Sequence, residues 1–483
     1  MKLIFNLGNL RKNKFIKILK AKKILLLDDV ENKDYKRIEK KVRNRNVATI
    51  YQVASIFNFT ELYKLSLCYI ERCFPVVCEK YNFKMLDFAR IAKIVSSSEL
   101  NIDSEMEVMK AIDSWINYDF EERSKFASRL LSKVRFSLLS VDALNSVLDS
   151  DMSFSKIDDC VAILRNALKN NETSDRNMSS RFCSQHMFNI FLSGGFINQP
   201  TFRLTGCPKL LSAENLNQVK DIARMNIKRV VNHKSVYCKG AVYVFGGYDE
   251  NCQVVKSVEK YSFVTKKWEN ICEMSDDRRD FCACAFMDRI YIIGGSNNAW
   301  NPFYSCMKLS TKDNKWYEVA GINHARISSA STVYEGRIVI SGGINNNDII
   351  NNFNTVQAYD PFGDTWSSMP NMIEGRCNQG SVAMRNKLFV FGSLQGNGFN
   401  SCEVFDSTCK TFVMLKQLPS TLKFNFCFAA DTFAIGNKLI TISYYSPTAL
   451  YYDVENDEWS DETFNLTKDN YVFRGTILPQ IKF

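Results

Sequence analysis

Histidine is scarce in this chain of 483 residues, which contains only His186, His233 and His324. The three lie far apart, and none has a partner at the spacing that metal ligands need. The 16 cysteines include no CxxC pair, and the shortest separation is the two positions between Cys282 and Cys284. A multi-histidine metal centre or a zinc site is therefore not expected, and we predict no cofactor and no metal.

The chain also lacks a long apolar run. None approaches the roughly 18 residues needed to cross a bilayer, so we expect no membrane partner. The first residues, "MKLIFNLGNLRKNKFIKILKAKK", place lysine in every apolar stretch and offer no signal-peptide core. Scattered, unpaired cysteines are typical of reduced, buried thiols. Together these absences predict a cytoplasmic protein.

The net charge of +10 comes from one end of the chain. Residues 1–45 hold 15 Lys or Arg and 5 Asp or Glu, so this segment alone carries +10. A basic segment could contact nucleic acid or an anionic membrane. The interpretation we favour is a solvated arm or a degenerate helical segment, and nucleic acid is not an expected partner.

A glycine motif that follows an apolar run recurs along the C-terminal three-fifths of the chain. The clearest copy is "VYVFGGYDENCQVVKSVEKYSFVTKKW", from Val242 to Trp268. Counted at the second glycine position, the copies lie 52, 48, 48 and 50 residues apart, at Gly195, Gly247, Gly295, Gly343 and Ser393, and Ser443 is 50 further on. A glycine loop that binds phosphate continues into a helix. Here no helix follows, so the glycines are predicted to form tight turns.

A second marker has the same period. A large residue follows an aromatic residue or leucine at an offset of seven, in the pairs Tyr261 and Trp268, Leu309 and Trp316, Tyr359 and Trp366, Phe405 and Phe412, and Tyr452 and Trp459. Polar, turn-forming residues separate the two members, which indicates a hairpin with both large side chains on one face. Units of about 48 residues with some four short strands must pack face to face, and radial repetition achieves this.

This pattern of strand, Gly-Gly, Tyr and Trp resembles the Kelch repeat of β-propellers. The resemblance covers Phe188 to the C-terminus and gives six units, the first without a regular aromatic pair and the sixth without its glycines. In the family, a terminal strand often completes the first blade. The segment "YVFRGTILPQI", from Tyr471 to Ile481, is expected to be that strand.

The N-terminal third has helical periodicity. Asn46 to Cys73 predicts two helices, the second with a cap within "NFTE" (58–61), and "SEME" (104–107) predicts a capping box. Behind that box, Val108, Ile112, Trp115 and Ile116 form an apolar stripe.

Two parts of this region resemble known domains. Residues 96–144 resemble the BACK domain, and residues 46–74 resemble the helical end of a BTB domain whose first half has no counterpart here. Such a truncation predicts weak or absent dimerisation. The general composition is most similar to poxvirus Kelch-like proteins.

The expected fold is multidomain: an α-helical N-terminal region, made of a BTB remnant and BACK, followed by an all-β, six-bladed Kelch β-propeller. The predicted boundaries are 1–45 for a basic segment, 46–74 for the BTB remnant, 75–168 for BACK, 169–187 for a linker and 188–483 for the propeller.

The resemblance implies a protein-interaction adaptor and not an enzyme. Its propeller would capture a protein target, and its helical region would link that target to a cullin-3 ubiquitin ligase. The alternative is a binding scaffold or decoy without a ligase, with a cytoskeletal or host-immune partner in the host cytoplasm. A copper-oxidase-like propeller is disfavoured, because its site would need converging His and Tyr ligands.

The predicted partner-binding residues are Arg279, Arg326, Arg376, Arg474 and Trp300. The arginines precede the inner strands at the position that faces the binding rim in the family, where they would favour an acidic target segment. Alternatively, each pairs with a nearby carboxylate such as Asp276, Asp277 or Glu374. Trp300 is out of register with the repeat, in the Asn-rich stretch "SNNAWNPFY". It would be an interface anchor or would pack on its own blade.

Overall fold

The computed structural model describes residues 42–172, apart from 103, and most of residues 188–479. The gaps within the second range are 195, 199–201, 205–207, 213–218, 230–231, 346–351, 385–386, 394–400, 408, 418–430, 436–437, 443–447, 464–469 and 472–473. The chain divides into two compact units between residues 181 and 182. The basic segment and most of the predicted linker lie outside the described residues.

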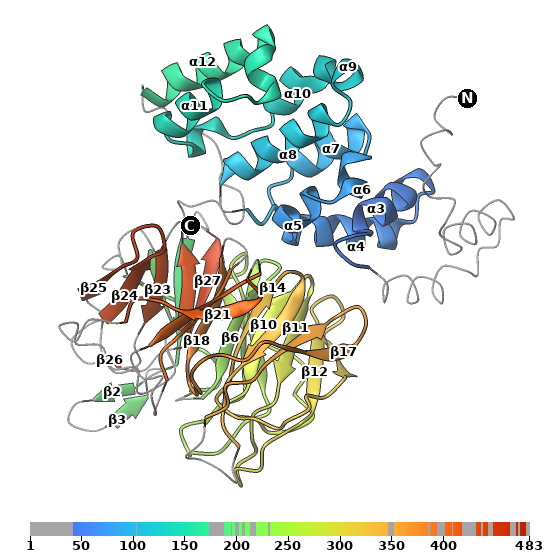
Figure 1. The fold of residues 1–483 in the computed structure, drawn as a ribbon. Helices are drawn as coiled ribbons and strands as arrows, with labels where there is room; N and C mark the ends of the chain where they lie inside the picture. Colours follow the sequence, from blue (N-terminus) through green and yellow to red (C-terminus); the bar gives the residue numbers. More distant parts are fainter. Residues whose placement is uncertain are drawn as a thin grey trace, which may run out of the picture. The chain divides into compact units, whose positions relative to one another are not determined.

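The first unit is helical (Figure 1). Its α-helices are α3 (Val47–Ile56), α4 (Thr60–Arg72), α5 (Phe74–Cys78), α6 (Tyr81–Lys84), α7 (Phe88–Val95), α8 (Glu105–Asn117), α9 (Phe120–Arg123), α10 (Ala127–Leu131), α11 (Val141–Leu148) and α12 (Asp158–Glu172). Short 3₁₀ turns join some of them, at Ser124–Phe126, Phe136–Leu138 and Ser153–Lys156. Because α12 continues to Glu172, it extends into the stretch predicted as linker. None of the described helices is long and apolar enough to cross a membrane.

The central helix α8 begins where the sequence predicts. The hydroxyl of Ser104 accepts a hydrogen bond from the N–H of Met106 at 3.2 Å and so caps the helix. The predicted apolar stripe is buried. Within it, the indole of Trp115 donates to the carbonyl of Leu86 at 2.7 Å, which satisfies its polar atom in the core.

The predicted cap within 58–61 is wrong. Asn58 has φ of +53°, and α4 begins at Thr60 after Phe59. The N–H of Phe59 returns to the carbonyl of Ala54 at 2.9 Å. Asn58 therefore ends α3 in the left-handed conformation that asparagine tolerates, and it does not start α4.

The second unit is a ring of six four-stranded antiparallel sheets, the blades. Blade 1 has the strand order β27 (Arg474–Pro479), β1 (Phe188–Ser193), β4 (Lys209–Ser212) and β5 (Val219–Asp221). Blades 2 to 6 follow in chain order: β6 (Lys234–Cys238), β7 (Ala241–Phe245), β8 (Val258–Ser262) and β9 (Lys267–Asn270); β10 (Cys282–Phe286), β11 (Arg289–Ile293), β12 (Cys306–Ser310) and β13 (Lys315–Val319); β14 (Ala330–Tyr334), β15 (Arg337–Ser341), β16 (Val356–Asp360) and β17 (Thr365–Met369); β18 (Gly380–Met384), β19 (Lys387–Phe391), β20 (Cys402–Asp406) and β21 (Thr411–Met414); and β22 (Asp431–Ile435), β23 (Lys438–Ile442), β24 (Thr448–Asp453) and β25 (Glu458–Thr463). A small additional sheet contains β26 (Asn470–Tyr471), β2 (Phe196–Asn198) and β3 (Phe202–Leu204).

The ring is closed by two strands that lie at the beginning and at the end of the propeller's sequence. The innermost strands contact one another in the order β6, β10, β14, β18, β22, β27 and back to β6. β27 pairs antiparallel with β1, and Phe188 lies opposite Pro479. The predicted closing strand is confirmed, and closure leaves no exposed edge on blade 1's inner side.

The core lies between the blades, which explains the apolar runs before the glycines. All five residues of β7 are buried. Val242 and Val244 face a cluster shared with blade 1, and Tyr243 and Phe245 face a cluster shared with blade 3. Because both faces of the strand are covered, its sequence is continuously apolar instead of alternating.

The seven-residue offset is a register pair. In all five copies the two large residues lie directly opposite each other on the two outer strands of a blade. The indole N–H of Trp268 donates to Ala223 of the previous outer connection at 2.7 Å, and that of Trp366 donates in the same way to Ala320. The hairpin tryptophans thus fill space on their own blade and bond to the preceding connection, whereas Phe412, which has no N–H donor in its ring, only packs.

The glycines sit where neighbouring blades approach closely. Gly294 has φ of +60°, and a Cβ there would come 2.7 Å from the carbonyl oxygen of Arg326. Gly240 also has positive φ, +84°, but a Cβ there would meet nothing within 4 Å. Both replacements by alanine impose backbone strain, and only the first also forces an overlap with the next blade.

We therefore expect Gly294→Ala to lower the propeller's free energy of unfolding by about 2–5 kcal/mol, and Gly240→Ala by about 1–2 kcal/mol. Urea unfolding followed by tryptophan fluorescence measures this, since five of the six tryptophans lie in this unit. Equal losses for the two variants would show that contact between blades is unimportant at the glycine pair.

Candidate functional site

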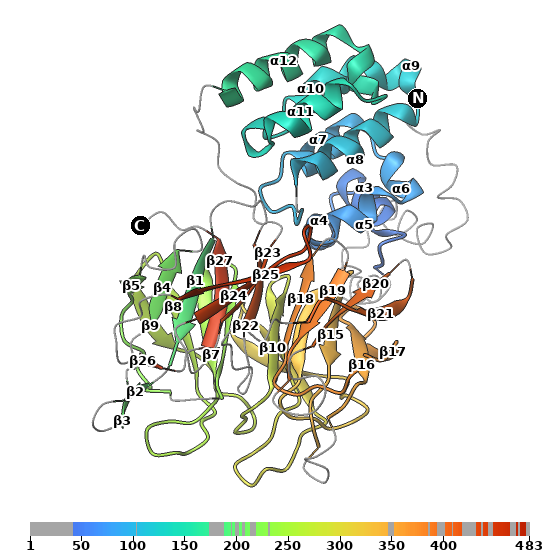
Figure 2. The same ribbon diagram turned by 60° about the vertical axis from the view of Figure 1, so that its left-hand side comes forward.

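The long connections gather at one end of the propeller, which we call the loop end (Figures 1 and 2). Since the strands alternate in direction, the connections after the second and fourth strand of each blade share that end. They are 246–257, 271–281, 294–305, 320–329, 342–355 and 370–379 for blades 2 to 4 and the entry to blade 5. Turns such as 239–240 and 263–266 lie at the opposite end.

Arg326 and Arg376 lie in the loop-end connections 320–329 and 370–379. Their side chains point into the propeller and are fully buried. Nη1 of Arg326 donates to the carbonyl of Gly342 at 2.9 Å, and Nη2 donates to the hydroxyl of Thr355 at 3.1 Å. Nη1 of Arg376 donates in the same way to Gly392 at 3.0 Å. Each guanidinium therefore holds the connection that follows the second strand of the next blade along the chain, at Gly342 for Arg326 and at Gly392 for Arg376.

The sequence interpretation missed two equivalent residues. Arg278 is also buried and donates to the carbonyl of Gly294 at 3.0 Å, and buried Arg229 donates to that of Gly246 at 3.1 Å. Arg278, Arg326 and Arg376 each stand 16 positions before the glycine they bind. A spacing of 16 positions before the first glycine of the pair identifies Arg278, and not Arg279, as the repeat residue.

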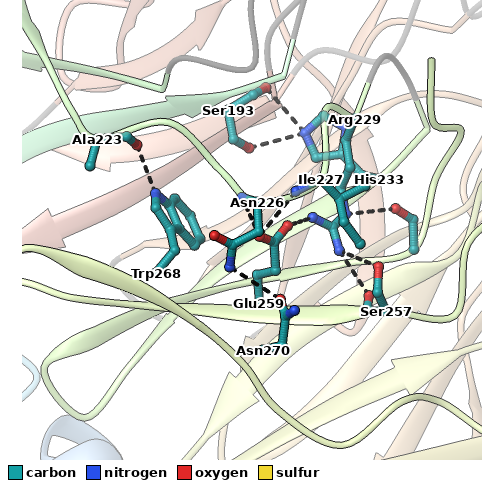
Figure 3. A network of polar contacts seen from close by, with 11 residues as sticks. Ser193, Ala223, Asn226, Ile227, Arg229, His233, Ser257, Glu259, Trp268 and Asn270 are labelled. Carbon is teal, nitrogen blue, oxygen red and sulfur yellow. Dashed lines mark hydrogen bonds and ion pairs between the residues drawn. The ribbon is translucent and has the colours of Figure 1, made fainter.

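Two of these arginines meet a buried carboxylate. Glu259 and Glu403 are both inaccessible to solvent and pair with Arg229 and Arg376. Glu259 also accepts from the backbone N–H of Asn226 at 2.6 Å (Figure 3). Burial lowers the pKa of Arg229 to about 9, because desolvation disfavours the charged guanidinium.

This geometry favours the intramolecular alternative for Arg326 and Arg376. The partner of Arg376 is Glu403 and not the suggested Glu374, and the partner of Arg326 is a set of carbonyl and hydroxyl oxygens. Asp276 does pair with an arginine, Arg278, at 3.1 Å. Contact with a target by these two arginines stays a prediction, but their guanidinium groups offer it no accessible surface.

Arg474 differs from the other three. It is the first residue of β27 and lies opposite Ser193, whereas Arg279, Arg326 and Arg376 lie in connections before a strand. Its side chain is outside the described residues. The four predicted arginines therefore do not form one set.

Arg279 and Trp300 are brought together. The guanidinium carbon of Arg279 lies 3.3 Å from the centroid of the Trp300 ring and 5.3 Å from that of Tyr248. Nη1 of Arg279 pairs with Asp280 at 3.1 Å. Arg279 is buried, while Trp300 is 49% exposed. The two residues, from connections 271–281 and 294–305, thus form a stack whose outer member faces solvent.

Other large apolar side chains are exposed on the loop-end connections. Tyr304 lies in the same connection as Trp300, and Ile373 lies in 370–379; both are more than half exposed. Exposed aromatic and aliphatic side chains on loops held by a rigid ring are typical of a protein-binding surface.

Among the residues that the structure describes, the histidine and cysteine side chains form no reactive centre. His233 is buried, with Nε2 3.0 Å from the hydroxyl of Ser193, while His324 is exposed in 320–329 and His186 lies outside the described residues. Burial raises the pKa of the Cys306 and Cys402 thiols to about 12. Across the described residues, no group of three or more His, Cys, Asp or Glu side chains could hold a metal ion.

Comparison with known families matches both units. Residues 47–149 match the BTB And C-terminal Kelch (BACK) domain, and residues 232–442 match the KLHDC2/KLHL20/DRC7 Kelch-repeats domain. These matches support a BACK–Kelch protein. The BACK match includes the segment that we interpreted as the end of a BTB domain, so the BTB remnant and the boundary at residue 74 stay predictions.

The individual proteins to which this chain is similar include several Kelch-like proteins. It is similar to Kelch-like protein 7 of Rattus norvegicus, with 29% identity over 438 residues, 87% of this chain and 72% of that protein. Identity to Kelch-like protein 7 of Homo sapiens is 31% over 370 residues, 75% of this chain and 61% of the relative. Kelch-like protein 28 of Homo sapiens is 33% identical over 132 residues, 27% and 23% of the two chains.

We expect Arg376→Met to lower the propeller's free energy of unfolding by about 3–5 kcal/mol, because it leaves the buried carboxylate of Glu403 without its cation. Adding Glu403→Gln should restore part of the loss, since it removes the unpaired buried charge, although its one amide oxygen can replace only one of the two carboxylate oxygens that accept from the N–H groups of Ile373 and Glu374. Urea unfolding of the three proteins measures the effect. A variant Arg376→Met of unchanged stability that loses a target would instead support the predicted contact role.

Proposed function

We propose that this BACK–Kelch chain is a protein-interaction adaptor whose propeller holds a target protein at the loop end. The observation that carries the proposal is the contrast at that end: the repeated polar groups are buried and bonded, while Trp300, Tyr304 and Ile373 are exposed. The matches to Kelch-like relatives support a protein-interaction role instead of an enzymatic one. The helical unit, which matches BACK, would link the target to a cullin-3 ubiquitin ligase.

An acidic target segment loses much of its support. That hypothesis depended on four guanidinium groups at one opening, and Arg279, Arg326 and Arg376 are buried. Two carboxylates, Glu250 and Glu273, are exposed on the loop-end connections 246–257 and 271–281. A target that depends on shape and apolar contact agrees better with this surface than a strongly acidic one.

The alternative adaptor is a scaffold or decoy that binds its target without recruiting a ligase. A viral origin, a host-cell partner, a cytoplasmic location and weak dimerisation belong to the same proposal, since they depend on the resemblance to poxvirus Kelch-like proteins and on the BTB remnant. The two adaptor hypotheses differ in one component, cullin-3.

Affinity purification of the full chain from cells should recover cullin-3 together with one abundant target. The control is Trp300→Ala, which should lose the target and keep cullin-3, because the two partners are assigned to different units. The pair Arg326→Ala and Arg376→Ala is unsuitable, since it removes buried bonds of the fold. Recovery of the target without cullin-3 would contradict the ligase link and favour the scaffold. Recovery of neither, from a folded propeller, would contradict the adaptor itself.

A further inference from the structure

Trp300 occupies an unfavourable conformation on an exposed loop. Its φ is +62°, a left-handed value that bulky residues rarely adopt, and about half of its surface faces water. Backbone strain of this kind persists only where the surroundings impose it, and it gathers at binding sites. An exposed, strained tryptophan is therefore a candidate for contact with a partner.

The loop around Trp300 fixes the direction of its side chain. The N–H of Trp300 donates to the carbonyl of Asn297 at 3.1 Å, and the side-chain oxygen of Asn297 accepts from the N–H of Asn301 at 3.0 Å. Ser296 and Arg279 exchange two backbone hydrogen bonds of 3.0 Å. The loop is thus paired with the neighbouring connection, and the indole is held in place before any partner arrives.

Arg279 covers the inner face of the indole. Besides its pair with Asp280, it donates from Nε to the carbonyl of Asn297 at 3.4 Å. Its Nη2 is buried and makes no hydrogen bond within the described part of the chain. The position of this guanidinium is therefore determined by the Trp300 and Tyr248 rings and Asp280, not by a full set of hydrogen bonds.

We propose that the outer face of Trp300 is the anchor of the loop end and stacks on an aromatic side chain of the target, with Arg279 as a positioning residue behind it. This inference rests on the proposed function, and it names the chemistry of the contact. A rigid indole with one free face loses little side-chain entropy on binding, which is a feature of interface hot spots.

The charge of Arg279 behind the indole favours an aromatic side chain of the target over a charged one at the outer face of Trp300. A cation already sits on one face of the indole and draws its π electrons inward, so the outer face is a poor site for a Lys or Arg of the target. A carboxylate gains little, because Asp280 neutralises Arg279 and the indole covers it. An aromatic ring suffers neither penalty and adds stacking to the area that it buries.

The test uses a random peptide library displayed on phage and selected on the full chain. Peptides selected by the wild type should share an aromatic residue at one position, and its replacement by leucine should weaken binding at least about tenfold. Trp300→Ala should cause a similar loss, whereas Trp300→Phe should lose about threefold or less. Tyr317→Ala, which removes another exposed aromatic ring from β13, is the matched control and should bind as the wild type.

Arg279 is tested by selectivity. Arg279→Gln removes the cation, so it should weaken the aromatic peptide and strengthen the same peptide with arginine at the anchor position. A role confined to folding would weaken both peptides equally and would contradict the positioning role. Selected peptides that bind Trp300→Ala as tightly as the wild type would overturn the proposal and leave the adaptor function standing. Failure to select any peptide, together with no target in the affinity purification, would count against both.

Discussion

Three of the junctions between neighbouring blades, at Arg278, Arg326 and Arg376, depend on a buried arginine that bonds to both blades at once. The backbone carbonyl of Arg326 accepts from the N–H of Gly295 in blade 3, while its guanidinium donates to the carbonyl of Gly342 in blade 4. Arg278 and Arg376 repeat the arrangement with Gly247 and Gly343. A Cβ on the first glycine of a pair, at Gly246, Gly294 or Gly342, would lie 2.3–2.7 Å from the carbonyl oxygen of Arg278, Arg326 or Arg376. The glycine pair and the arginine therefore form a single joint, and the period of the sequence is the period of that joint.

The joint requires a guanidinium in the protein interior, where charge is costly. The blades meet that cost differently. The second residue of the third strand is Glu259 in blade 2 and Glu403 in blade 5, but Met307 in blade 3 and Gln357 in blade 4. Where no carboxylate is present, as at Arg326, neutral oxygens take its place and burial lowers the pKa of that guanidinium to about 10. The planar fork of arginine, with five donors, tolerates both solutions, which lysine would not.

Features that depend on local spacing could be predicted from the sequence. The glycine period, the seven-residue hairpin offset and the closing strand near residue 474 are all confirmed, because each is a repeated pattern of residues close along the chain. The direction of a long side chain is different, since tertiary contacts decide it. Arg326 and Arg376 were placed on the rim because of their sequence position, yet they point inward to carbonyls that only the folded ring supplies. Asn58 failed for a related reason: asparagine suits both the end and the start of a helix, and the turn geometry decides between them.

In the proposed adaptor, recognition of the target comes from residues that do not take part in the joint. The repeated arginines and glycines are buried because they join neighbouring blades, so they are not available to contact a target. Trp300 breaks the repeat. It stands in the middle of connection 294–305, whose two ends, Gly294 and Ser305, are bound by Arg278, and it stacks on Arg279, one position past that joint arginine. Two adjacent arginines thus have different roles: Arg278 joins two blades, whereas Arg279 supports Trp300, the proposed contact with the target.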